Sequence, residues 1–84
     1  MTAEALLVET VLRIVREEFA DRIGRGHVLT RETRLQEDLG ADEAERDFLG
    51  YALEEETGLG LEPYATRTWR TVGDVIDSCL AQLG

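Results

Sequence analysis

Apolar residues recur at helical spacing in three separate parts of the chain, and this periodicity constrains the fold more than any other feature. In the clearest segment, steps of three and four form one unbroken stripe of Val72, Val75, Ile76, Cys79, Leu80 and Leu83. Thr71 comes directly before this stripe, and Asp74 lies three residues after Thr71, which is the spacing of an N-terminal helix cap. No segment alternates apolar and polar residues as a half-buried strand would. We therefore predict an all-α fold.

A first helix is predicted over residues 3–23. Its apolar positions are Leu7, Val8, Val11, Leu12, Ile14, Val15, Phe19 and Ile23. Gly24 and Gly26 follow this stretch and are expected to end the helix, since glycine readily adopts the left-handed backbone that stops one.

The helical pattern is lost over residues 25–41, which predicts a long loop. Val28, Leu29 and Leu35 are the apolar side chains expected to insert from this loop into the core. A loop of this length is uncommon in a compact domain and is usually functional where it occurs.

A second long helix is predicted from residue 42 or 43 to about residue 57. Asp42 and Glu45 have capping-box spacing, and Gly58 supplies the stop. Gly50 lies in the middle and costs about 1 kcal/mol relative to alanine. The apolar residues are Ala44, Phe48, Leu49, Tyr51, Ala52 and Leu53.

Residues 63–69 can form at most a short helical turn, with Pro63 near its first position. Residues 1–84 are thus expected to form a single domain, a small up-and-down bundle of three main helices and one short helix.

The charge is strongly unbalanced, with 18 acidic residues, nine basic residues and a formal net charge of -9. Such a surface repels nucleic acid and anionic membranes, so neither is a predicted partner. A protein partner with a basic patch is favoured, although acidity alone also keeps a small domain soluble. All basic residues are arginine, which excludes Schiff-base chemistry by a lysine side chain.

The sequence predicts a cytoplasmic protein. No apolar run approaches the roughly 20 residues that span a bilayer, and the N-terminus does not have the pattern of a signal peptide. Cys79 is the only cysteine, which excludes an internal disulfide and fits a reducing compartment.

Residues 37–44 contain Leu-Gly-Ala-Asp followed by Glu43 and Ala44. This segment resembles the prosthetic-group motif of acyl carrier proteins, in which Leu-Gly-Ala-Asp is followed by serine and then leucine. In that family the serine hydroxyl carries 4'-phosphopantetheine, whose thiol holds the acyl group. A carboxylate cannot form that phosphodiester, so no cofactor is expected on Glu43.

The resemblance extends over nearly the whole chain. Residues 33–42 resemble the loop that leads to the carrier motif, and residues 52–56 resemble the acidic second half of the family's second helix. Residues 61–63 are similar to its Ile-Pro turn, with the proline one place late, and residues 71–77 to the start of its last helix. The resemblance implies an acyl-carrier-like bundle.

Departures from the family are concentrated in the second helix. Asp47 and Thr57 replace apolar residues, and Gly50 replaces an aliphatic residue, at positions that in the family help line the acyl space. Asp47 is expected to be exposed, because burying it unpaired would cost several kcal/mol. Phe48 is expected either to turn inward and fill that space or, together with Tyr51, to remain exposed as an apolar anchor.

Ser78 is the only serine and an alternative attachment site. The family's serine lies at a helix N-terminus, where free N–H groups and the dipole favour a phosphate. Ser78 falls late in the last predicted helix, and we expect it to face water.

The carboxylates of Asp42, Glu43, Glu45 and Asp47 could be read as a catalytic or metal site. The EF-hand pattern is absent, however, and no histidine is near in sequence. Acids in a first helical turn are stabilised by the helix dipole without any further role. We therefore predict no metal site.

The remaining candidate residues have structural interpretations. Cys79 lies in the apolar stripe and is expected to be a core thiol. His27 has no partner at motif spacing and is expected to be a solvated loop residue. Trp69 is expected to pack beneath the short helix. Because no nucleophile, base and orienting group occur together, an enzyme is not predicted.

The sequence predicts a docking protein of fatty-acid, polyketide or related thioester biosynthesis, whose partners are acyl-transferring or condensing enzymes with basic patches. The docking face would consist of Asp42, Glu43, Glu45, Phe48, Tyr51, Glu54 and Glu55. Glu43 would either mimic a phosphate charge or mark a simple loss of the attachment site. Two alternatives stay open: a working carrier with its arm on Ser78 or a threonine, and an unrelated acidic interaction module.

Overall fold

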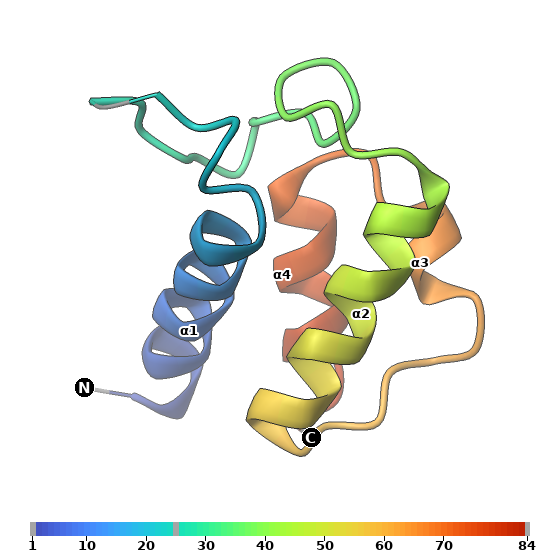
Figure 1. Cartoon of the computed structure of the whole chain (residues 1–84). Helices are drawn as coiled ribbons and strands as arrows, with labels where there is room; N and C mark the ends of the chain where they lie inside the picture. The colour runs from blue at the N-terminus through green and yellow to red at the C-terminus, as the bar shows by residue number, and fades with distance from the viewer. Residues whose placement is uncertain (1, 25, 84) are drawn as a thin grey trace.

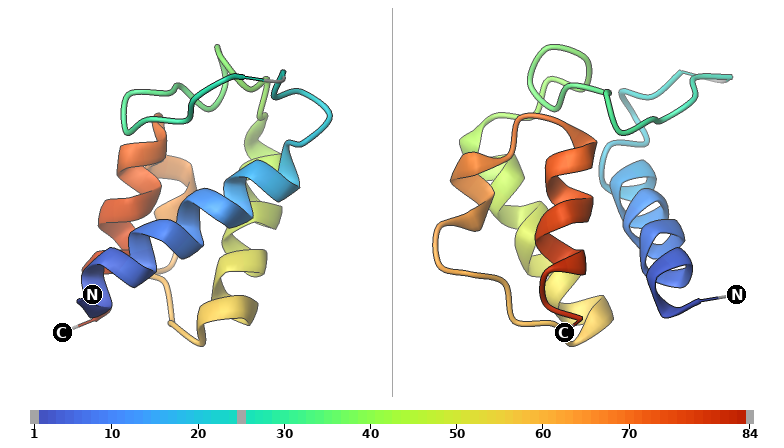
Figure 2. Two further views of the ribbon diagram at one scale, coloured as in Figure 1. Left: turned by 90° about the vertical axis from the view of Figure 1, so that its left-hand side faces the viewer. Right: turned by 180° about the vertical axis from the view of Figure 1, so that it is seen from behind.

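The computed structural model describes residues 2–24 and 26–83. In this part of the chain there are four helices and no strand: α1 (Ala3–Glu18), α2 (Glu43–Thr57), α3 (Ala65–Thr68) and α4 (Val72–Leu80). α1 crosses one side of the bundle and packs against both α2 and α4, while α3 packs against α2 and, less extensively, against α4 (Figures 1 and 2). The predicted all-α bundle with a long loop between its first two helices is confirmed.

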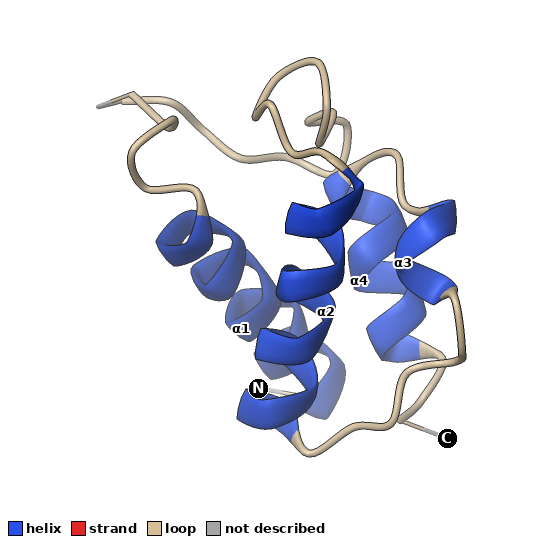
Figure 3. Cartoon of the chain, turned by 45° about the vertical axis from the view of Figure 1, so that its right-hand side comes forward, coloured by secondary structure: helices blue, strands red, loops and turns tan. Residues whose placement is uncertain are grey.

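The direction of the helices differs from a simple up-and-down bundle. α1 runs toward the long loop, whereas α2 and α4 both run away from it (Figure 1). This is possible because residues 58–71 return along the length of the bundle, as the tan connection in Figure 3 shows. That connection brings α3 beside the first half of α2 before α4 begins.

α1 ends at Glu18, not at the predicted residue 23, and so it ends before Gly24 is reached. Phe19 leaves the helical conformation, and its carbonyl oxygen accepts the N–H groups of Arg22 and Ile23. Phe19 is buried and Ile23 packs against the core. The turn after α1 thus keeps both side chains facing inward. The apolar pattern in the sequence therefore continues past the end of the helix.

The long loop is fastened to the start of α4. The N–H of Leu35 donates to the carbonyl of Arg70 at 2.9 Å, and the N–H of Val72 donates to the carbonyl of Thr33 at 2.9 Å. Thr33 is buried, and its hydroxyl accepts the N–H of Thr30. The loop is therefore an ordered, hydrogen-bonded strap.

The loop also contributes more to the core than the sequence predicts. Leu29 and Leu35 are buried as expected, and Leu39 and Ala41 are buried with them. Val28 is 72% exposed, against expectation. Of these two neighbours in the loop, Leu29 therefore faces the core and Val28 faces solvent.

The two longer helices after the loop, α2 and α4, begin as predicted. α2 has a complete capping box between Asp42 and Glu45, and Gly58 ends it at φ 72°. α4 has the same device between Thr71 and Asp74. Each cap satisfies backbone N–H groups that have no partner inside the helix.

The short helix α3 begins two residues later than predicted, so Pro63 is not at its first position. Tyr64 precedes it in the left-handed region, at φ 65°. A bulky residue rarely adopts this conformation, and the sequence carries no signal of it.

The core lies between α1, α2 and α4. Its largest fully buried side chains include Leu49 and Leu53 from α2 and Ile76 from α4. Leu83 is exposed, which corrects the predicted stripe, because α4 ends at Leu80 and the chain leaves the core there.

Candidate functional site

The N-terminus of α2 is fixed by Asp42, whose carboxylate accepts the N–H of Glu45 at 2.8 Å. The carboxylate of Glu45 in turn accepts the N–H of Asp42 at 3.4 Å. Asp42 is exposed and serves as a cap, so one predicted docking carboxylate already has a structural role.

Glu43 lies in the first turn of α2, and its carboxylate is 62% exposed. It pairs with the Nε of Arg67 from α3 at 3.5 Å. The Arg67 guanidinium also lies 4.8 Å from the centre of the Tyr64 ring. Where the resemblance places an alcohol, the structure thus has an acid held beside a cation.

Glu45 forms an ion pair with Arg22, which follows α1. The hydrogen bond from the Arg22 guanidinium lowers the pKa of Glu45, while partial desolvation opposes the shift and the Asp42 N–H reinforces it. The same pair raises the pKa of Arg22. This ion pair joins the end of the first helical segment to the start of α2.

The other two predicted docking carboxylates differ from each other. Glu54 is half-buried and accepts the N–H of Leu61 at 3.0 Å. Glu55 is exposed, and among the described residues it has no hydrogen-bond or ion-pair partner. The docking carboxylates are therefore mostly engaged within the chain, through arginines and backbone N–H groups that sequence reasoning did not connect to them.

An exposed ridge runs along α2, and we call it the outer ridge. It is formed at helical spacing by Ala44, Phe48, Tyr51 and Glu55. Phe48 is 65% exposed and Tyr51 is 68% exposed. Phe48 therefore does not turn inward, and of the two predicted arrangements the structure has the exposed one.

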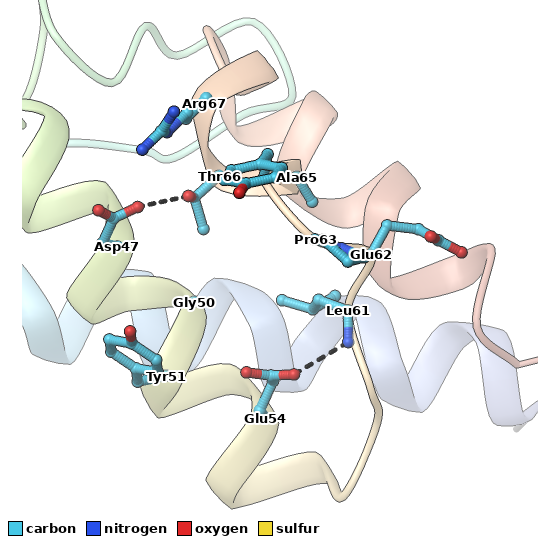
Figure 4. Close-up of a pocket in the computed structure, with 11 residues that line it drawn as sticks. Asp47, Gly50, Tyr51, Glu54, Leu61, Glu62, Pro63, Ala65, Thr66 and Arg67 are labelled. Atoms are coloured by element: carbon cyan, nitrogen blue, oxygen red, sulfur yellow. Dashed lines mark hydrogen bonds between the residues drawn. The ribbon is translucent and has the colours of Figure 1, made fainter.

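A groove of about 360 Å³ separates α2 from α3 and the connection before it (Figure 4). The hydroxyl of Thr66 donates to Asp47 across it at 2.5 Å. Asp47 is half-buried and paired, contrary to the predicted exposure, because α3 brings it a hydroxyl donor. The groove is lined by Asp47, Gly50, Tyr51, Glu54, Leu61, Glu62, Pro63, Tyr64, Ala65, Thr66 and Arg67.

Gly50 lets α3 approach α2 closely. A Cβ atom at this position would lie 2.6 Å from Cγ2 of Thr66 and 3.8 Å from the Trp69 ring. Trp69 is buried, as predicted. The volume lost at Gly50 is thus occupied by Thr66 and Trp69, which corrects the idea that Phe48 fills it.

Ser78 does not face water as expected. Its hydroxyl oxygen accepts the indole N–H of Trp69 at 2.8 Å, and the residue is half-buried within α4. Its backbone lies inside a helix, so Ser78 lacks the free N–H groups that favour a phosphate.

Two further residues considered from the sequence are Cys79 and His27. Cys79 is buried, and desolvation raises the pKa of its thiol to about 11, which disfavours the reactive thiolate. His27 is exposed in the loop. Within the described ranges no group of three metal-ligating side chains is found.

None of the helices in residues 2–24 and 26–83 has the length and apolar character of a membrane span.

No protein-family model and no curated protein matches this chain.

Proposed function

We propose that this chain is an acidic docking protein of acyl-carrier type. It binds a basic surface on an acyl-transferring or condensing enzyme of fatty-acid, polyketide or related thioester biosynthesis, and it carries no phosphopantetheine arm of its own. The observation that carries the proposal is the outer ridge, where two large apolar side chains stand exposed on an acidic helix.

The charge around the ridge supports a basic partner. Residues 42–57 contain seven carboxylates and a single basic residue, Arg46. Exposed aromatic residues supply the desolvated centre of many protein interfaces, while surrounding charges speed and orient association. Phe48 and Tyr51 would serve as the anchors and Glu55 as a rim charge.

The absence of a tether is supported by the two positions at which one was considered. Glu43 offers no alcohol, and its charge is shared with Arg67. Ser78 is engaged by Trp69 inside α4. These contacts favour docking over a working carrier whose arm is attached at Ser78.

Docking is tested by measuring the affinity of the chain for a purified condensing enzyme. Phe48→Ala and Tyr51→Ala are expected to weaken binding about tenfold each, the size typical of interface anchors. Leu6→Ala is the matched control, because Leu6 is an exposed apolar residue on α1. Added salt should weaken binding of the wild type. Equal effects of all three substitutions would refute the outer ridge as the docking face.

The missing arm is tested by intact mass after incubation with coenzyme A and a broad-specificity phosphopantetheinyl transferase. The wild type should keep its mass, and Glu43→Ser should gain one arm if the recognition surface survives. A gain of one arm by the wild type, lost in Ser78→Ala, would overturn the proposal in favour of a working carrier. Salt-sensitive binding only to proteins outside thioester metabolism would instead indicate an unrelated acidic module.

A further inference from the structure

A second hollow lies where α3 meets the long loop and the start of α4, and its charged lining residues are mostly arginine. We call it the arginine cleft. It has a volume of about 480 Å³ and is lined by Arg34, Gln36, Glu37, Arg46, Arg67, Trp69, Arg70 and Thr71. Four of the nine arginines of a protein with net charge -9 thus meet at one hollow.

Four separate parts of the fold bring these arginines together. Arg34 comes from the strap-like loop, Arg46 from the first turns of α2 and Arg67 from α3. Arg70 lies between α3 and α4, where its carbonyl holds Leu35 of the loop. The isolated antiparallel bridge between Arg34 and Thr71 closes this junction. The convergence depends on the tertiary fold, and sequence spacing does not reveal it.

The cleft retains unused donor capacity. Arg46 donates to the carbonyl of Ala41 at 2.8 Å, but its Nε is the one buried side-chain nitrogen or oxygen without a partner among the described residues. The Arg70 guanidinium has no hydrogen-bond or ion-pair partner in the same ranges. A buried donor without an acceptor is unfavourable, so an anion that came within reach of this Nε would be stabilised.

Acidic side chains near the cleft offset its charge in part. Glu37 is its only acidic lining residue. Arg34 pairs with Asp38 at 3.4 Å, and Arg67 pairs with Glu43 at 3.5 Å. Both pairs are longer than a typical charge-assisted hydrogen bond of about 2.8 Å and are exposed, so the guanidiniums can still bind another anion.

We infer that the arginine cleft is a binding site for a small organic phosphate. Guanidinium groups match the oxygen geometry of phosphate, and a phosphate offers several acceptors to donors that arrive from different directions. The cleft volume lies in the range of small-ligand sites, which leaves room for the group that bears the phosphate. This site does not depend on the outer ridge or on the proposed docking function.

The test uses Trp69, the only tryptophan, which lines the cleft. Titration with inorganic phosphate or glycerol 3-phosphate at constant ionic strength should shift the NMR signals of the Trp69 indole N–H and the Arg46 Nε–H saturably. Arg70→Gln should weaken binding about tenfold, the loss of one charged hydrogen-bond partner. Arg16→Gln is the control, because it removes an exposed arginine of α1 outside the cleft.

Tighter binding of the ester than of inorganic phosphate would identify an organic phosphate as the ligand. Equal binding would assign the cleft to free phosphate and correct the ligand class. The inference is overturned if the shifts fail to saturate, if chloride or acetate produces them equally, or if the two arginine variants behave alike. Spectra of both variants without ligand verify that each is folded.

Discussion

α2 and α4 begin with the same capping device and run in the same direction (Figure 1), yet they use their apolar residues differently. α4 buries Val72, Val75, Ile76 and Cys79 completely or nearly so. α2 buries Leu49 and Leu53 but leaves its two aromatic residues on the surface. Packing of the core therefore explains the apolar stripe of α4. In α2 it explains the buried leucines but not the two exposed aromatic residues.

Each of these helices also contains a glycine at a close contact. Gly73 of α4 donates its N–H to the carbonyl of Arg31, and a Cβ atom there would lie 3.0 Å from that carbonyl oxygen. Gly50 of α2 admits Thr66. The glycine of α4 allows the loop to bind closely, whereas the glycine of α2 allows α3 to pack closely against α2.

The largest expected effect is a difference in the free energy of unfolding between substitutions on the buried face and on the exposed face of α2. Leu53→Ala should lower the free energy of unfolding by about 2–5 kcal/mol, as should Ile76→Ala in α4, because each leaves a cavity. Phe48→Ala should change it by less than about 0.5 kcal/mol, since its side chain is exposed. Urea unfolding measures all three. A cost for Phe48→Ala near that of Leu53→Ala would show that the outer ridge is part of the folded core.

The next effect concerns Gly50. Gly50→Ala should destabilise the protein by about 1–3 kcal/mol despite its better helix propensity, because the new methyl overlaps Cγ2 of Thr66. In the background of Thr66→Ser, which removes that methyl and keeps the hydroxyl for Asp47, the same change should instead stabilise by up to about 1 kcal/mol. A stabilising effect in the wild-type background would contradict the close contact.

Loss of a cap should affect both helices alike. Thr71→Ala and Asp42→Ala are each expected to lower the free energy of unfolding by about 1 kcal/mol, because an N–H of the first turn loses its acceptor. Thermal unfolding checks this. A clearly unequal pair of losses would mean that one helix start is held by tertiary contacts rather than by its cap.

The smallest effect is a pH dependence specific to α2. Because the folded-state pKa of Glu45 is lowered by Arg22, its pairing stabilises the fold above the unfolded pKa of about 4.3 and is lost as pH falls through the lower folded value. The difference in Tm between the wild type and Glu45→Gln should therefore shrink between about pH 5 and pH 3. Glu55→Gln is the control, and its smaller difference should not follow this course.

Local signals explain what the sequence predicts well. Both capping boxes and the stop at Gly58 depend on residues a few positions apart, and all are confirmed. The predicted stripe of α4 is confirmed from Val72 to Cys79 but not at Leu83. The early end of α1 was missed because the turn at Phe19 preserves inward spacing. The start of α3 was missed because the left-handed Tyr64 has no sequence signature.

The candidate site was less predictable because its contacts join distant residues. Glu43 meets Arg67, and Asp47 meets Thr66, only after the connection returns along α2. The arginine cleft likewise collects residues from four segments. One signal was available in the sequence, since every basic residue is arginine, the side chain suited to paired recognition of acids and phosphates.

The packing of α1 against α4 has a consequence for how the protein is made. During synthesis α1 leaves the ribosome before α4, one of the two helices against which it packs, has been translated. Until then the apolar stripe of α1 lacks part of the surface that buries it. A nascent chain in that state is prone to aggregation and is a substrate for chaperones. The stripe of α1 is therefore buried stably only after α4 has been translated.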